Sequence, residues 1–231
     1  NFGTYYWRVR ANDSINITGP SSSTGDLKPL SPGWTSRTIG ISNPKPWTAI
    51  AWAPSIGKFC AVSAVGSYAP WDQQAMTSSN GIDWTIHATP AQQAELNDLC
   101  WAPELSKFCA ISYTNGGYDQ VFLSSNGSAW SSYQSAWNAL NWTCVCWSGS
   151  QFVAGSMNGY FMTSPTGTAW TLRDAGLGGK QWKSIVWAPG LSLFVAVAAT
   201  GEVATSSNGA TWILRTPAVY NNWRSVAWSP A

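Results

Sequence analysis

Residues 47–54 read Trp-Thr-Ala-Ile-Ala-Trp-Ala-Pro, and versions of this phrase begin again at Leu96, Trp142, Trp182 and Trp223. The copies begin roughly 40 to 50 residues apart, and a period of that length is typical of folds built from repeated units. The fifth copy stands at the end of the given sequence, with no second half after it. The interpretation of the fold therefore depends on where that last unit is completed.

Each of the first four units also contains a turn motif, Ser-Asn-Gly or a close variant, followed by a tryptophan. The four copies are Thr77–Trp84, Leu123–Trp130, Thr163–Trp170 and Thr205–Trp212. Glycine adopts a positive φ at low cost, and Ser or Asn side chains accept hydrogen bonds from turn amides. The motif therefore predicts a β-hairpin in every unit.

Between the repeated phrase and the turn lies a short apolar run that starts at Phe59, Phe108, Phe152 and Phe194. Each unit thus reads as four short strands, A to D, without helical periodicity. This pattern predicts an all-β, five-bladed β-propeller of four-stranded antiparallel blades. We expect one domain over residues 1–231, with blades at about 47–95, 96–141, 142–181 and 182–222, and a composite fifth blade of 223–231 plus 1–46.

The N-terminal stretch contains what the fifth unit lacks. Pro20–Gly25 is similar to the turn, and Gly33–Ile39 matches the outer strand at Thr211–Pro217. We expect the C-terminal strand A to join these N-terminal strands and close the ring, which removes exposed sheet edges. A competing interpretation is that Gly3–Ala11 belongs to the end of a fibronectin type III domain, in which case the chain is cut from a larger modular protein.

With these Ser-x-x-Gly-x-x-Trp turns, the chain resembles the Asp-box (BNR) repeat β-propellers, a group that includes sialidases and non-enzymatic binding propellers. The aspartate that names the motif is replaced by Ser79, Ser125, Pro165 and Ser207. In size and repeat style the chain is also similar to five-bladed tachylectin-type lectins, although no sugar-binding motif matches residue by residue. The resemblance implies a fold more strongly than a function.

Composition narrows the function classes. The 12 basic and 10 acidic residues give a net charge of +2 and form no basic stripe, so we expect no nucleic-acid partner. No apolar run reaches the roughly 18 to 20 residues of a membrane-spanning helix. The five cysteines lack metal-ligand spacing and fall at repeat-equivalent places, which predicts buried thiols, with no disulfide framework, metal or cofactor.

The resemblance to sialidases implies a test for catalysis, namely three arginines that converge on a carboxylate. One repeat position, three residues after the strand D tryptophan, holds Arg37, His87, Tyr133, Arg173 and Arg215. This position lies on the outer strand, so its side chains cannot meet at the axis, and His87 is expected to be an exposed rim residue. No carboxylates recur in the pairing that glycosidases use. We therefore predict a non-enzymatic protein with no catalytic residues.

The loops between strands B and C differ most among the copies, and in a propeller they share one face with the D-to-A loops. An aromatic residue followed by Asp-Gln occurs twice in them. Aromatic rings stack on sugars while Asp and Gln bind hydroxyls, although the same residues could simply pin a long loop. The predicted ligand-binding residues are Tyr68, Trp71, Asp72, Gln73, Tyr118, Asp119, Gln120, Trp137, Tyr160 and Glu202.

Three functions stay open at this point. The favoured one is a carbohydrate-binding propeller with a glycan or cell-surface receptor as partner, bound by loops on one face or in pockets between blades that are lined by strand A Trp and rim Arg or Tyr. The second is a protein-interaction or structural module of a modular extracellular or phage tail protein, and the third is a sialidase-like hydrolase. We expect a monomer or a part of a larger protein, in an extracellular or virion-associated setting.

Overall fold

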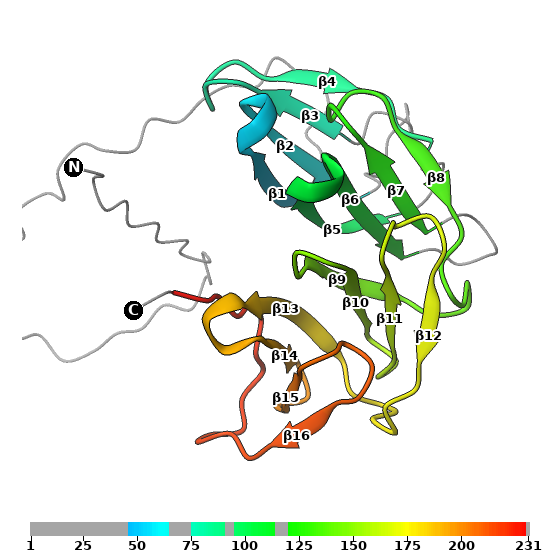
Figure 1. The fold of residues 1–231 in the computed structure, drawn as a ribbon, viewed down its shortest axis with the longest axis vertical. Helices are drawn as coiled ribbons and strands as arrows, with labels where there is room; N and C mark the ends of the chain where they lie inside the picture. Colours follow the sequence, from blue (N-terminus) through cyan, green and yellow to red (C-terminus); the bar gives the residue numbers. More distant parts are fainter. Residues whose placement is uncertain (1–45, 65–74, 91–94, 114–119, 230–231) are drawn as a thin grey trace, which may run out of the picture. The chain divides into compact units, whose positions relative to one another are not determined.

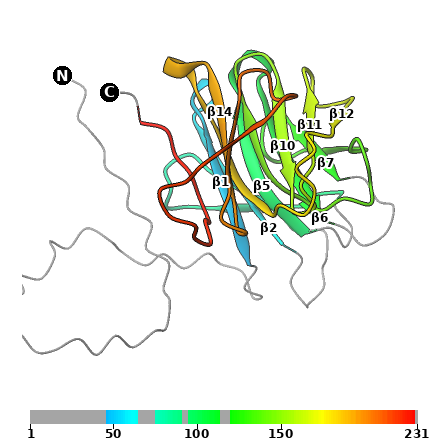
Figure 2. The same cartoon turned by 90° about the horizontal axis from the view of Figure 1, so that it is seen from below.

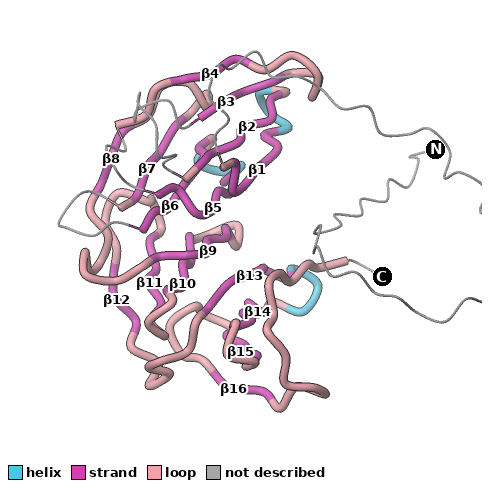
Figure 3. The backbone as a smooth tube through the Cα atoms, turned by 180° about the vertical axis from the view of Figure 1, so that it is seen from behind, coloured by secondary structure: helices cyan, strands magenta, loops and turns pink. Residues whose placement is uncertain are grey.

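The computed structural model describes residues 46–64, 75–90, 95–113 and 120–229, all within the unit formed by residues 38–231. Within this part of the chain, sixteen strands form four antiparallel sheets of four strands each, and every sheet keeps its strands in chain order. The first strand of each sheet lies innermost and the fourth lies at the periphery (Figures 1 and 3). These sheets are the first four predicted blades.

The strand bounds follow the repeat closely. Blade 1 contains β1 (Trp47–Ala53), β2 (Lys58–Ser63), β3 (Ala75–Ser78) and β4 (Thr85–His87). Blade 2 contains β5 (Glu95–Ala102), β6 (Lys107–Tyr113), β7 (Val121–Ser124) and β8 (Ser131–Tyr133). Blade 3 contains β9 (Trp142–Trp147), β10 (Phe152–Ser156), β11 (Phe161–Ser164) and β12 (Thr171–Arg173). Blade 4 contains β13 (Trp182–Ala188), β14 (Leu193–Ala198), β15 (Val203–Ser206) and β16 (Ile213–Arg215).

The turns have the predicted chemistry. The four turn glycines, Gly81, Gly127, Gly167 and Gly209, all have positive φ. In each turn the amide of the glycine donates to a serine Oγ three residues earlier, at 2.8 to 2.9 Å. The strand D tryptophan closes the turn, because its indole N–H donates to the carbonyl of the same glycine.

Inner strands share a β-bulge near their start, and it decides which side chains meet between blades. We number inner-strand positions from the first residue of the repeated phrase, so that position 1 is Trp47, Leu96, Trp142, Trp182 or Trp223. Pairing with the second strand slips after position 1 in all four sheets. Because a bulge inserts one extra residue, positions 1 and 4 point to the same face of the sheet.

Hydrophobic clusters form between consecutive blades rather than within one blade. Between blades 3 and 4, for example, Cys144 and Cys146 at positions 3 and 5 pack against Trp182 and Ile185 at positions 1 and 4. Equivalent clusters join blade 1 to blade 2 and blade 2 to blade 3. Trp142 and Trp182 are fully buried. The burial of each such indole contributes at most about 4 to 6 kcal/mol to the free energy of folding.

The last described segment, Trp223–Ser229, has no assigned strand but lies along β13. The amide of Val226 donates to Ser184 Oγ at 3.2 Å, as the amide of Val145 donates to Asp98 Oδ2 at 2.8 Å between blades 2 and 3. Both bonds join position 4 of one inner strand to position 3 of the strand before it. The segment therefore occupies the place of a fifth inner strand.

The prediction of an all-β propeller of four-stranded antiparallel blades is confirmed. The proposed outer strands of the fifth blade, around Pro20–Gly25 and Gly33–Ile39, and the fibronectin-like stretch Gly3–Ala11 lie outside the described residues. Their placement stays a prediction. Among the residues described, no helix has the length and apolar character needed to cross a membrane.

The five cysteines are packing residues, as the sequence predicted. Cys60, Cys109, Cys144 and Cys146 are buried, Cys100 is partly buried, and all five thiols are free. Burial raises the pKa of each thiol, to about 12 for Cys60. They are thus protonated at neutral pH, which makes them poor nucleophiles.

Candidate functional site

The chain order within each sheet places the B-to-C and D-to-A connections at one end of the strands and the A-to-B and C-to-D turns at the other. Figure 2 shows the strands running between these two faces. We call the first face the loop face. Of the predicted ligand-binding residues, Gln120, Trp137, Tyr160 and Glu202 are described. Six lie outside the described residues: Tyr68, Trp71, Asp72, Gln73, Tyr118 and Asp119.

Trp137 and Tyr160 come together on the loop face. Their rings meet edge to face, with centroids 5.7 Å apart and an interplanar angle of 70°. Trp137 comes from the loop between blades 2 and 3, and Tyr160 from the β10–β11 turn of blade 3. The Trp137 side chain is 46% exposed, so its ring keeps a large free surface. An exposed ring on a well-braced turn is a suitable stacking surface for a ligand.

Gln120 has a structural role, which the sequence did not distinguish from a role in ligand binding. The residue is fully buried. Its Nε2 donates to the Leu140 carbonyl at 2.9 Å, and its Oε1 accepts from Ser135 Oγ at 2.6 Å. Both ends of the amide are therefore satisfied by the loop that carries Trp137. Gln120 pins that loop, as the alternative interpretation had it, and we leave it out of the site.

Glu202 lies on the loop face of blade 4 and is paired. Lys180 Nζ donates to Glu202 Oε1 at 2.6 Å. Burial raises the pKa of Glu202, but hydrogen bonds from Lys180, from Thr200 and from its own amide outweigh burial, so the pKa lies below the ordinary value. The pair ties the turn of blade 4 to the loop before it, which leaves little of this carboxylate for a ligand.

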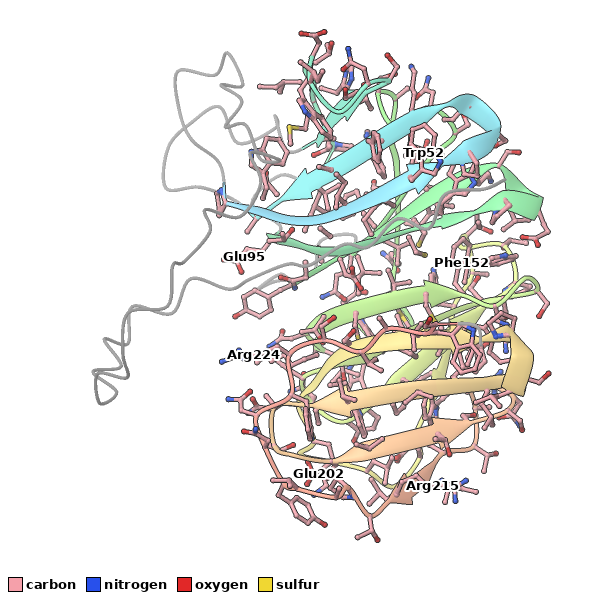
Figure 4. All side chains as sticks on the ribbon, turned by 90° about the vertical axis from the view of Figure 1, so that its left-hand side faces the viewer. Trp52, Glu95, Phe152, Glu202, Arg215 and Arg224 are labelled. Carbon is pink, nitrogen blue, oxygen red and sulfur yellow. The ribbon has the colours of Figure 1, made fainter. Side chains whose placement is uncertain are left out.

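A cavity of about 500 Å³ opens among the starts of the inner strands of blades 2, 3 and 4. Its lining mixes polar and apolar surface and comes from Glu95, Asn97, Tyr113, Asn141, Thr143, Met157 and Lys183. We call it the axial cavity. In Figure 4, the labelled Glu95 marks the end of the inner strands at which the axial cavity lies, and Trp52 lies towards the other end of the blades.

The axial cavity and the Trp137–Tyr160 pair are parts of one surface, because the same two segments build both. Asn141 and Met157 line the cavity and are joined by two hydrogen bonds, one of them from the Met157 amide to the Asn141 carbonyl at 2.9 Å. Trp137 lies four residues before Asn141, and Tyr160 three residues after Met157. We call the axial cavity and this aromatic pair together the candidate site.

Sequence reasoning missed the cavity residues because it looked for function in loops of variable length. Asn97, Thr143 and Lys183 all occupy position 2 of an inner strand, which is the extra residue of the bulge and has no paired residue on the second strand. A signal was present in the alignment of the repeats, since position 2 holds only polar residues: Thr48, Asn97, Thr143, Lys183 and Arg224.

The rim position expected from the repeat does not form a converging site in the described part of the chain. Arg173 Nε donates to Thr163 Oγ1 at 3.0 Å, and Arg215 Nε donates to Thr205 Oγ1 at 2.8 Å. Each arginine thus bonds within its own blade. His87 Nε2 lies 2.8 Å from Thr77 Oγ1 and is partly buried, so the expectation of an exposed histidine was wrong. Burial, and to a lesser degree Lys58, lower the pKa of His87.

A second hollow, of about 290 Å³, lies on the rim of blade 2. Trp130, Tyr133 and Lys107 line it, together with five smaller residues of strands C and D and of the turn between them. No strand A tryptophan contributes to it. It therefore differs from the predicted pocket between blades, in which a strand A Trp would stand beside a rim Arg or Tyr.

Comparison with solved structures places the chain among β-propellers. Virginiamycin B lyase from Staphylococcus aureus superposes with a TM-score of 0.63 at 7% identity, over 77% of this chain and 57% of the lyase. YCF48 from Cyanidioschyzon merolae gives 0.58 at 10% identity, over 82% and 62%. An auxiliary nutrient binding protein from Bacteroides thetaiotaomicron gives 0.55 at 10% identity, over 74% and 42%. The chain thus spans less than two thirds of each of these three neighbours.

No protein-family profile and no curated protein sequence matches the chain. The similarity to solved structures therefore concerns the fold alone, and those structures include an enzyme as well as a binding protein. The resemblance to Asp-box propellers stays a prediction from the turns.

Proposed function

We propose that the chain is a non-catalytic recognition propeller that binds carbohydrate on its loop face, at the candidate site. The observation that carries the proposal is the exposed Trp137 ring, braced edge to face by Tyr160 beside a cavity whose lining includes amide, hydroxyl and charged side chains. A sugar presents an apolar ring face and a rim of hydroxyls. The site offers an aromatic surface for the first and amide and hydroxyl groups for the second.

The scaffold supports this use. The segment of Trp137 is held by Gln120, and the turn of Tyr160 is held by Ser156, whose Oγ accepts from the Tyr160 amide at 3.1 Å. A rigid surface loses little conformational entropy when it binds a ligand. Tyr68, Trp71, Asp72, Gln73, Tyr118 and Asp119, which lie outside the described residues, stay proposed contacts.

Two of the fold neighbours bear on the class of function. One is named as a nutrient binding protein and another is a lyase, so the fold serves binding and catalysis alike. Within the described residues, the arginines of the rim are engaged within their own blades, which gives no support to a sialidase-like centre. We therefore favour binding over catalysis.

The test is a glycan array followed by titration of the best glycan, with intrinsic tryptophan fluorescence as the readout. We expect Trp137→Ala to weaken binding about 10-fold, in line with the roughly 1.4 kcal/mol of a stacking contact. Ile82→Ala is the matched control, because Ile82 has the same 46% exposure and lies in a C-to-D turn on the opposite face.

Binding of no glycan at all would contradict the carbohydrate proposal and move the chain to the protein-interaction class. Equal loss of binding in Trp137→Ala and Ile82→Ala would instead place the sugar elsewhere on the propeller. Hydrolysis of an aryl glycoside or a sialoside by the purified chain would overturn the non-catalytic assignment.

A further inference from the structure

Position 2 of the inner strands is the point where neighbouring blades are joined at the axial cavity. The Thr48 hydroxyl donates to the Leu96 carbonyl at 2.6 Å, and the Asn97 amide donates to the Trp142 carbonyl at 2.9 Å. The Thr143 hydroxyl donates to the Trp182 carbonyl at 2.6 Å. In each case position 2 bonds to position 1 of the next blade. Asn97, Thr143 and Lys183 of this series line the cavity.

Arg224 is the next member of the series. The Val226 amide bonds to Ser184 Oγ, which sets Trp223–Ser229 in the register of an inner strand. Trp228 supports the same register. Its ring lies against Gly190 of blade 4, where an added Cβ would be 3.3 Å away. The equivalent Trp147 donates a hydrogen bond to Glu104, which occupies the position of Gly190 in blade 2. Arg224 is exposed, and Figure 4 shows it at the same end of the inner strands as Glu95.

At the cavity end of the inner strands, the described basic side chains outnumber their acidic partners. Lys180 is paired with Glu202, whereas Lys183 and Arg224 have no acidic partner among the residues that the structure describes. Glu95 is the one carboxylate in the described cavity lining. Lys183 lines the cavity beside this one acidic side chain, and Arg224 adds a second unpaired cation at position 2 of the following inner strand, at the same end of the strands.

We propose that the axial cavity binds the acid group of an anionic sugar, a carboxylate or a sulfate, at its Lys183 side, with Arg224 of the following inner strand as a second cation. This inference rests on the proposed function and names the class of glycan. The Thr143 hydroxyl donates to the Trp182 carbonyl and the Asn97 amide nitrogen donates to the Trp142 carbonyl, so these two side chains can offer sugar hydroxyls only acceptors, Thr143 Oγ1 and Asn97 Oδ1. Charge-assisted hydrogen bonds to the acid group supply the specificity.

The acid group is expected to dominate affinity at low salt. The Lys183 ammonium in the cavity lining and the exposed Arg224 guanidinium at the same end of the inner strands attract an anion over a distance of about 10 Å at 0.1 M salt. Glu95 repels the acid group, which favours the Lys183 side of the cavity for it. The neutral part of the sugar is then directed towards the Trp137–Tyr160 pair.

The experiment compares three oligosaccharides on one backbone, which are neutral, uronate-containing and sulfated, by titration calorimetry with the full chain. We expect the acidic forms to bind about 10-fold more tightly than the neutral one, and Lys183→Gln and Arg224→Gln each to remove most of this difference. Lys183→Arg should retain it. Lys58→Gln is the control, because it removes the same charge at the start of β2, at the opposite end of the blades.

The outcomes separate the two proposals. Equal affinity for neutral and acidic forms, unchanged by Lys183→Gln, overturns the anionic site while carbohydrate binding stands. Binding of none of the three, together with an empty glycan array, overturns both. A difference between uronate and sulfate identifies which acid the cavity prefers. Unfolding curves of the variants show whether a loss of binding comes from a loss of fold. If Lys183→Gln does not fold, Lys183→Arg, which should keep the preference for acidic forms, and Arg224→Gln, which should lose it, still test the site.

Discussion

Asp98 shows how one residue joins two blades. Its Oδ2 accepts from the Val145 amide at 2.8 Å, and its Oδ1 from the Leu99 amide at 2.9 Å. Burial raises the pKa of Asp98 to about 6, although these two amide bonds lower it. In blade 4 the same position is Ser184, which makes the equivalent bond without a charge. The acidic group is therefore not required for the connection between blades.

The raised pKa predicts a pH dependence of stability. The folded state holds the proton more tightly than the unfolded state, so this contribution is complete below about pH 4 and is lost as the pH rises to about 6. The loss is at most about 3 kcal/mol for a shift from 3.8 to about 6. We expect Asp98→Ser to flatten the free energy of unfolding between pH 4 and 7, measured by urea denaturation at each pH.

Asp174→Ser is the control for that measurement, because Asp174 is an exposed carboxylate in a turn. Its replacement should leave the slope unchanged. An Asp98→Ser protein with the slope of the parent chain would mean that Asp98 is ionised in the folded state across this range.

At the scale of elements, the turn glycines do more than permit a hairpin. Gly127 has φ +76°, and a Cβ placed there would lie 2.6 Å from Thr77 Cγ2 and 3.2 Å from Cys60 Sγ of the preceding blade. Gly209 likewise approaches Val153 of the preceding blade. The turn therefore packs between blades, and its glycine is needed both for the backbone conformation and for the close approach.

This double role can be separated with two substitutions. Gly57 also has a positive φ, +60°, but a Cβ there meets nothing within 4 Å, and the equivalent Ser106 and Ser192 show that the position accepts a side chain. Gly57→Ala should cost about 1 kcal/mol of folding free energy, from φ strain alone. Gly127→Ala should cost about 2 to 4 kcal/mol, because overpacking adds to the strain. Equal costs in urea denaturation would show that the contact with blade 1 relaxes freely.

At the scale of the whole molecule, the described blades leave one face uncovered. Ile50 is 58% exposed and Trp52 is 43% exposed in blade 1, whereas the equivalent Leu99 and Trp101 of blade 2 are 5% and 9% exposed. Blade 1 thus has the apolar side chains of an interface without a described neighbour. The proposed composite blade, with Trp223–Ser229 as its inner strand and its outer strands from residues 1–46, would supply that neighbour.

A closed ring would make the C-terminal strand necessary for cooperative folding. A chain that lacks residues 223–231 should lose its single unfolding transition, because both blade 4 and blade 1 would then have an open face. The measurement is thermal unfolding followed by circular dichroism. Addition of a synthetic peptide of residues 223–231 should restore part of the transition, while a truncated chain with an unchanged melting curve would contradict the closed ring.

Much of the fold could be predicted from the sequence because it depends on neighbours along the chain. The turn glycines, the serine that bonds to each of them and the alternating strands are local chemistry repeated four times. The candidate site was predicted less well. Trp137 and Tyr160 were expected on one face, but the sequence did not indicate that they touch, that Gln120 is buried beneath their loop, or that Glu202 is paired with Lys180.

The sequence by itself determined the repeat, the four strands of each blade and the position of the fifth inner strand, since short-range hydrogen bonding and side-chain alternation encode them. The tertiary structure alone decided which groups surround the axial cavity. That choice depends on a bulge and on the register between inner strands that begin 40 or more residues apart, which together place Asn97, Thr143 and Lys183 around one cavity although they are far apart along the chain.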